Sequence, residues 1–131
     1  MKRYKKRAFT LIELVAVAAI LGILIALLVP KINGYIKESK KAIVIDQARK
    51  ARQAVETYEM LNEKEFKDKD VTGCTKNTIK AVLTFDETNK YLEGEKLDKL
   101  KEDMTMDIVY EIVENRVDFT IDALGRFEGT I

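Results

Sequence analysis

The chain of 131 residues has no histidine and no tryptophan, and it has only one serine, one proline and one cysteine. Without histidine, it cannot build a serine or cysteine nucleophile activated by a histidine base, or a metal site with histidine ligands. The single cysteine, Cys74, excludes an intramolecular disulfide. No glycine-rich loop of the kind that cradles phosphate groups is present. These absences argue against an enzyme, and no cofactor is expected.

Two loop acids, Asp68 and Asp70, are the best remaining candidates for metal binding. Their spacing lacks the glycine and the terminal glutamate of a calcium-binding loop. A solvated acidic loop is therefore the default interpretation, and no metal site is expected.

The strongest feature that is present is an apolar segment, residues 9–30, with a single charged side chain, Glu13. As an α-helix that rises about 1.5 Å per residue, it matches a hydrocarbon core of roughly 30 Å. A carboxylate inside such a span costs about 2.5–3.5 kcal/mol on insertion scales, so it normally faces a partner group. Glu13 is thus a candidate functional residue. The alternative is a plain single-pass anchor whose acid lies near the membrane interface.

Residues 1–8 form a basic leader with five Lys or Arg side chains and no acid. Positive charge ahead of an apolar span keeps that end in the cytoplasm. A secretory signal peptide begins in the same way, but its apolar region is shorter and ends in a small-x-small cleavage site. The run here ends in Val29-Pro30-Lys31 without such a site. We therefore expect the helix to be retained as a single-pass span.

The order of a basic leader, a small residue, Phe-Thr-Leu-Ile-Glu and a long apolar run resembles the type IV prepilin family, including the pseudopilins. In that family a membrane aspartyl peptidase cuts before the phenylalanine and methylates the new amine. The resemblance thus implies cleavage between Ala8 and Phe9 and N-methylation of Phe9. It makes Glu13 the fifth mature residue, where the family keeps its acid, and Gly22 and Pro30 also match. Ala8 departs from the glycine that the family usually has there.

Physical chemistry gives Phe9 and Glu13 a joint role. Cleavage would create an ammonium group at the start of a helix in lipid, where it is poorly solvated and opposed by the helix dipole. Glu13 lies one turn away, so its carboxylate can neutralise that amine in the same chain or in a neighbouring one. Staggered helices favour the neighbour, and the pair then sets the axial register of a filament. Gly22 and Pro30 are expected to let the helix bend or locally melt.

Beyond the span, residues 31–64 continue a helical pattern and form an amphipathic half of the helix. The apolar stripe on this half comprises Ile32, Ile36, Ile43, Ala51, Val55, Tyr58 and Leu61. Residues 65–105 form a variable connecting region, in which short helices are predicted at 78–83 and 96–101.

The last part, residues 106–131, alternates apolar and polar residues with period two. This pattern predicts an antiparallel meander of about three strands, at 106–112, 117–122 and 126–131. One face of the meander would cover the stripe of the helix. The predicted fold class is therefore α+β, a long helix packed on a small sheet, in the ladle form that the resemblance to pilins also implies.

The net charge of +1 is unevenly distributed. Residues 31–52, the stem, carry seven basic and two acidic side chains, whereas residues 53–131 carry eleven basic and nineteen acidic ones. A basic stem can lie near anionic headgroups, meet the acidic parts of neighbouring subunits, or form a solvated helix face. The acidic C-terminal part argues against general nucleic-acid binding, which needs clustered Lys and Arg.

These features favour a structural subunit that is inserted in the membrane and polymerised with itself into a helical surface filament. The resemblance implies a prepilin peptidase, an assembly platform with its ATPase and minor pilins as partners, and an extracellular pilus as the destination. The alternatives are a pseudopilin of a secretion or competence system, and a minor pilin whose C-terminal part binds DNA or a surface ligand. Adhesion, motility and DNA uptake are not distinguished. Many Gram-negative pilins carry a disulfide, so the lone Cys74 gives a slight indication of a Gram-positive host.

Overall fold

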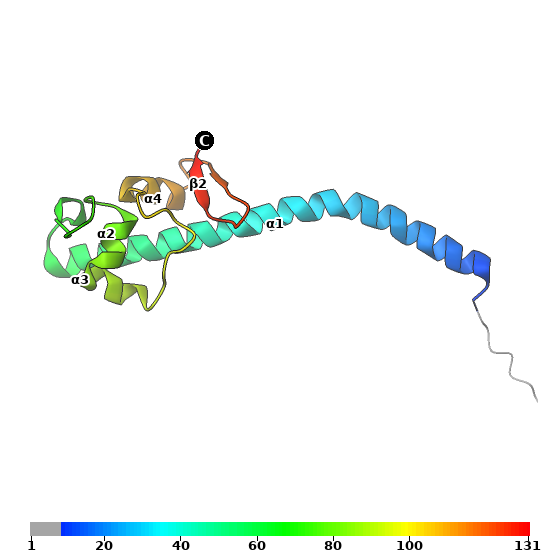
Figure 1. The fold of residues 1–131 in the computed structure, drawn as a ribbon, viewed down its shortest axis with the longest axis horizontal. Helices are drawn as coiled ribbons and strands as arrows, with labels where there is room; N and C mark the ends of the chain where they lie inside the picture. Colours follow the sequence, from blue (N-terminus) through cyan, green and yellow to red (C-terminus); the bar gives the residue numbers. More distant parts are fainter. Residues whose placement is uncertain (1–8) are drawn as a thin grey trace, which may run out of the picture. The chain divides into compact units, whose positions relative to one another are not determined.

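A computed structural model describes residues 9–131, and the basic leader with Ala8 lies outside the described residues. One long helix, α1 (Leu11–Asn62), precedes a series of short elements (Figure 1). These are η1 (Phe66–Asp68), α2 (Ile79–Thr84), α3 (Asp86–Asn89), η2 (Lys90–Leu92), α4 (Met106–Val113), β1 (Phe119–Ile121) and β2 (Phe127–Thr130). The chain divides into an N-terminal unit that ends at Ile36 and a head unit, Lys37–Ile131. The helix α1 contributes to both.

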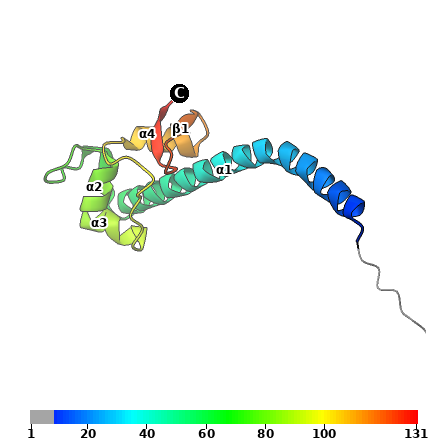
Figure 2. The same ribbon diagram turned by 45° about the vertical axis from the view of Figure 1, so that its right-hand side comes forward.

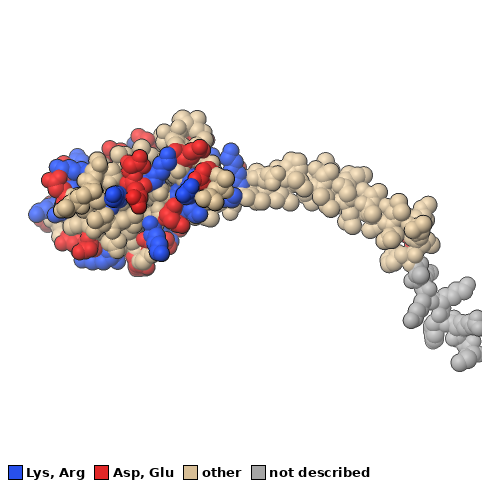
Figure 3. Space-filling view, viewed as in Figure 1, with Lys and Arg blue, Asp and Glu red and all other residues tan. Residues whose placement is uncertain are grey.

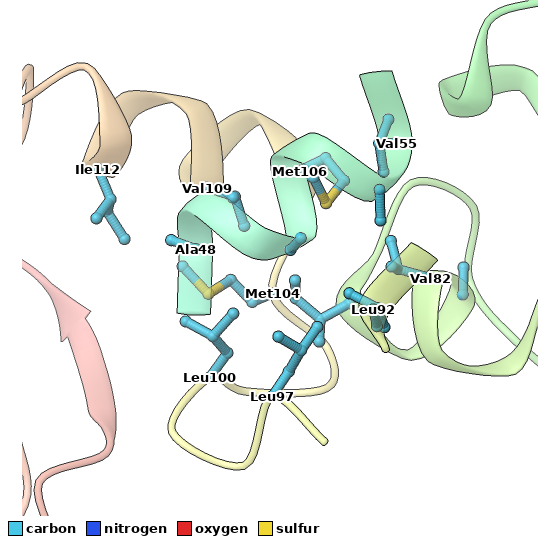
Figure 4. Close-up of a cluster of buried hydrophobic side chains, with 14 of the residues drawn as sticks. Ala48, Val55, Val82, Leu92, Leu97, Leu100, Met104, Met106, Val109 and Ile112 are labelled. Atoms are coloured by element: carbon cyan, nitrogen blue, oxygen red, sulfur yellow. The ribbon is translucent and has the colours of Figure 1, made fainter. Parts of the chain in front are cut away.

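The core of the head unit is built on the C-terminal half of α1. The buried residues of this helix recur every three to four positions and are Val44, Gln47, Ala48, Ala51, Ala54, Val55 and Tyr58. Three of them are alanines, whose small side chains let the covering segments approach the helix closely. Figure 4 shows Ala48 and Val55 surrounded by apolar side chains from α2, from the loop before α4 and from α4 itself.

The order of the covering elements along α1 is the same in two views. The β1–β2 hairpin and α4 lie along one stretch of the helix, and α2 and α3 lie closer to its C-terminal end (Figures 1 and 2). The apolar stripe expected from the sequence is only partly the buried face, because Ile43 and Leu61 are 47% and 64% exposed. The fully buried residues of α1 all lie in the stretch from Val44 to Tyr58.

The α+β class is confirmed, but the sheet has two strands instead of three. The strand predicted at 106–112 is wrong, since Met106–Val113 is the helix α4. Its buried residues, Met106, Val109 and Ile112, are three positions apart, which is the spacing of a helix face. The other two predicted strands are present as β1 and β2, which pair antiparallel with a register shift between Thr120 and Ile121.

The helix predicted at 78–83 is present as α2, and Thr78 caps it by accepting a hydrogen bond from the Ala81 N–H at 3.3 Å. The helix predicted at 96–101 is wrong. Leu97 is buried and has a left-handed φ of 53°. The backbone of Lys99 bonds outside the segment, because its N–H donates to Gln47 Oε1 and its carbonyl accepts from the Phe127 N–H, both at 2.8 Å. Tertiary hydrogen bonds have replaced a local helix here.

Polar contacts tie the basic stem to acids of its own head unit. Lys41 Nζ pairs with Asp118 at 3.1 Å, and Lys50 Nζ pairs with Glu95 at 2.7 Å. The hydrogen bond from Lys41 lowers the pKa of Asp118 below its usual value. Part of the stem's positive charge is therefore paired with acids of the same chain.

Candidate assembly segment

The N-terminal unit presents an apolar helix that has no buried face. All its described residues, from Phe9 to Ile36, are exposed, and Leu11 reaches 80%. On the face drawn in Figure 3, uncharged side chains make up nearly all of the described part of the N-terminal unit, whereas the head unit shows both signs of charge. Within residues 9–131, α1 is the one helix long and apolar enough to cross a membrane. An apolar surface of this extent requires cover by lipid or by other protein.

The start of this helix is set by two reciprocal hydrogen bonds between Thr10 and Glu13. The Thr10 N–H donates to Glu13 Oε2 at 3.4 Å, and the Glu13 N–H donates to Thr10 Oγ1 at 3.3 Å. This is a capping box, in which a residue at the N-cap and a Glu three positions later satisfy each other's backbone donors. This box was not among the predicted features, although Thr-x-x-Glu before an apolar run is its sequence signature. The carboxylate is thereby held at the helix N-terminus, where it bonds to Thr10, the residue that follows Phe9.

The structure groups the predicted site residues into two sets. Phe9 precedes α1 by two residues and Glu13 lies in its first turn, whereas Gly22 and Pro30 lie inside α1. The helix continues through both, so the local melting expected as one alternative is not observed. Proline has no N–H, so the carbonyl of Ala26 lacks its usual intrahelical donor. A bend at this point stays a prediction, and Ala8 lies outside the described residues.

The other candidates in the head unit do not form a chemical site. Cys74 is half-buried, with its Sγ 3.5 Å from Thr84 Oγ1. Asp70 pairs with Lys76 at 3.2 Å. Across residues 9–131, no group of three or more acids or cysteines is arranged to hold a metal ion.

Comparison with known proteins bears directly on the helix start. Residues 3–29 match the family model of the prokaryotic N-terminal methylation motif. The chain is 40% identical over 76 residues to a type IV major fimbrial protein FimA of Dichelobacter nodosus. The chain thus carries the prokaryotic N-terminal methylation motif and is similar, over part of its length, to type IV major fimbrial proteins. No solved structure gives a significant match.

The similarity to these pilins is partial. The first FimA alignment covers 58% of this chain and 48% of the relative, and a second FimA from the same organism is 38% identical over 74 residues, covering 56% and 45%. The chain thus spans about half the length of the curated relatives it matches. These relatives give no support to the expected Gram-positive host.

Proposed function

We propose that this chain is a type IV pilin, a filament subunit that is inserted in the membrane, processed between Ala8 and Phe9, and polymerised into a helical surface filament. The observation that carries the proposal is the N-terminal unit, an apolar helix without a buried face that begins at a single acid. The methylation motif and the similarity to major fimbrial proteins support it.

The same apolar surface serves two states of the subunit. In the membrane, lipid covers the helix of the N-terminal unit; in a filament, the corresponding helices of neighbouring subunits cover it. Since burial of apolar area is non-directional, it favours association without selecting one axial offset. Glu13 supplies the selection, because a subunit at any other offset would leave its carboxylate and a neighbour's Phe9 amine unpaired in an apolar environment.

The capping box is compatible with this pairing. Among the described residues, the cap uses only one oxygen of the Glu13 carboxylate, Oε2. The carboxylate has several lone-pair sites, so it can accept from Thr10 and from an ammonium group together. Its position at the helix start brings it close to the amine that cleavage would create on Phe9. A prepilin peptidase, an assembly platform with its ATPase, and minor pilins are the partners that such a subunit requires.

Mass spectrometry of the protein from native membranes and from sheared surface material tests this proposal. The expected result is a mature N-terminus at methylated Phe9 in abundant extracellular fibres. Recovery only from membranes with Met1 retained would refute both processing and polymerisation. Methylated Phe9 confined to the membrane would identify a pseudopilin instead, and traces in fibres built from another subunit would identify a minor pilin.

A further inference from the structure

The helix α4 presents only carboxylates on its outward side. Its buried residues are all apolar, and the exposed residues of the helix and its C-cap are Asp107, Glu111 and Glu114. These positions are three or four residues apart, so the three side chains share one side of the helix. The surrounding sequence, residues 102–115, carries no Lys or Arg that could interrupt the negative charge. We call these three residues the acidic face of α4.

The acidic face destabilises the helix that carries it. Asp107 and Glu111 are like charges at i and i+4, which repel each other. Glu111 and Glu114 lie at the C-terminal end of α4, where the helix dipole disfavours negative charge. The last turn contains no basic residue that would offset this cost. A positive partner outside α4 would relieve the repulsion.

The subunit itself supplies such a partner to only one of the three acids. Arg116 pairs with Glu114 at 2.9 Å. The other two members of the face form no ion pair with any residue from 9 to 131. Lys67 is close enough to Asp107 for its pKa to be raised slightly by that acid, but its ion pair, at 3.0 Å, is with Glu65. Two carboxylates of the acidic face therefore remain unpaired.

The stem carries the opposite charge in the same spacing. Lys37, Lys40 and Lys41 are three or four positions apart and share one side of α1. Lys41 is paired with Asp118 at 3.1 Å, whereas the ion pairs of the described chain include neither Lys37 nor Lys40. Glu38 is one residue from Lys37 and two from Lys40, so it faces neither of them.

The unpaired lysines and the unpaired acids match in number, charge and separation. Side chains three or four positions apart on a helix have Cβ atoms about 5–6 Å apart, so two helices that lie against each other can form both ion pairs together. Such a contact joins two different surfaces of the chain and is therefore heterologous. Heterologous contacts that do not close into a ring produce open helical polymers.

We propose that the acidic face of α4 in one subunit binds the side of the stem that carries Lys37 and Lys40 in a second copy of the chain. This inference rests on the polymerisation in the proposed function and names one contact of the polymer. A metal ion fits the acidic face less well, because within residues 9–131 no group of three or more acids or cysteines is arranged to hold one.

Charge reversal in the full chain tests the contact. Asp107→Lys with Glu111→Lys, and separately Lys37→Glu with Lys40→Glu, replace attraction by repulsion in every copy of the interface. The measured quantity is the ratio of subunit in sheared filaments to subunit in membranes when each variant is expressed alone. Both double variants should lower this ratio by at least about tenfold. The chain with all four changes should restore it, which also shows that the changes do not prevent folding.

Control variants change the net charge by the same amount and leave both surfaces intact. Glu63→Lys with Glu87→Lys matches the reversal of the acids, and Lys64→Glu with Lys80→Glu matches the reversal of the lysines. All four control positions are exposed in the head unit. Neither control should change the ratio of filament to membrane subunit.

Cross-linking tests the contact directly. Lys37→Cys with Glu111→Cys, in a Cys74→Ala background, leaves one lysine and one acid to pair. A bis-maleimide should then link neighbouring subunits of the filament into a covalent ladder. Lys64→Cys with Glu111→Cys in the same background should give no ladder.

Three results would overturn the inference and leave the proposed function intact. The first is an unchanged filament ratio in both double reversals. The second is a loss that the fourfold variant does not restore, without a cross-linked ladder, which would assign the two surfaces to other partners. The third is a loss confined to the lysine variants with weaker membrane retention, which would assign the lysines to lipid headgroups. Absence of filaments from the unmodified chain would instead refute the proposed function, and this contact with it.

Discussion

The two roles of Glu13, as a capping residue and as a charge, can be separated by substitution. Glu13→Gln keeps a capping box, since Gln serves at that position as well as Glu, but it removes the charge. Thr10→Ala keeps the carboxylate and removes the hydroxyl that accepts the Glu13 N–H at 3.3 Å. Glu13→Val removes both functions. All three variants are expected to insert in the membrane, because each leaves residues 14–30 unchanged.

The structure allows the two contributions to be compared in magnitude. Loss of an N-cap side chain costs about 1 kcal/mol, which corresponds to roughly a fivefold effect. Removal of one partner from a buried ion pair costs about 3–5 kcal/mol, or roughly a hundred- to several thousand-fold. If charge sets register, incorporation into filaments should fall by at least about a hundredfold in Glu13→Gln and Glu13→Val, and by less than about tenfold in Thr10→Ala.

The assay is quantitative mass spectrometry of sheared filaments and membranes from cells that express a variant together with the unmodified chain. The measured quantity is the ratio of variant to unmodified subunit in each fraction, so insertion and incorporation are determined separately. Incorporation of Glu13→Gln at the unmodified level would refute the role of charge. Equal losses in Thr10→Ala and Glu13→Gln would assign the effect to the cap.

Three further predictions concern the head unit. Thr88 is fully buried and donates to a backbone carbonyl at 2.7 Å, so Thr88→Val should lower the free energy of unfolding by about 1–3 kcal/mol in chemical denaturation; Thr88→Ser keeps the hydroxyl, and an equal loss there would contradict the explanation. Gly125→Ala should destabilise more than Gly73→Ala, because both glycines have a positive φ but only Gly125 is crowded, by Lys40; equal thermal melting temperatures would exclude that contact. Burial, followed by neighbouring acids, raises the pKa of Tyr110 from 10.0 to about 12. The folded state therefore holds the phenolic proton more tightly than the unfolded state does. The free energy of unfolding should fall as pH rises from 10 to about 12. Tyr110→Phe should reduce the decline, and an unchanged pH profile would show that other groups cause it.

The helix and its motif were predictable because their determinants are local. A long apolar run followed by a 3.6-residue pattern favours a helix regardless of neighbours, and α1 ends at Asn62, close to the expected boundary. The same local order of residues carries the N-terminal methylation motif. The capping box at Thr10 was also readable from four adjacent residues.

The head unit was predicted less well because its sequence is compatible with more than one periodicity. Residues 106–113 have apolar side chains at both strand and helix spacing, and only packing of Met106, Val109 and Ile112 in the common core selects the helix. Leu97 and Leu100 suggested a helix by their spacing. The bonds that Lys99 makes with Gln47 and Phe127 instead hold that segment as an irregular loop.

The sequence by itself determined the main features of the N-terminal unit: an apolar helix of membrane length, one acid at its start, and the residues of the N-terminal methylation motif. Tertiary structure decided which face of the stem is covered, that the sheet has two strands, and that residues 106–113 form a helix. The physical reason is the separation along the chain of the residues that interact. Helix formation and capping depend on residues up to four positions apart, whereas the contact of Gly125 with Lys40 joins residues far apart in the chain, which no local pattern records.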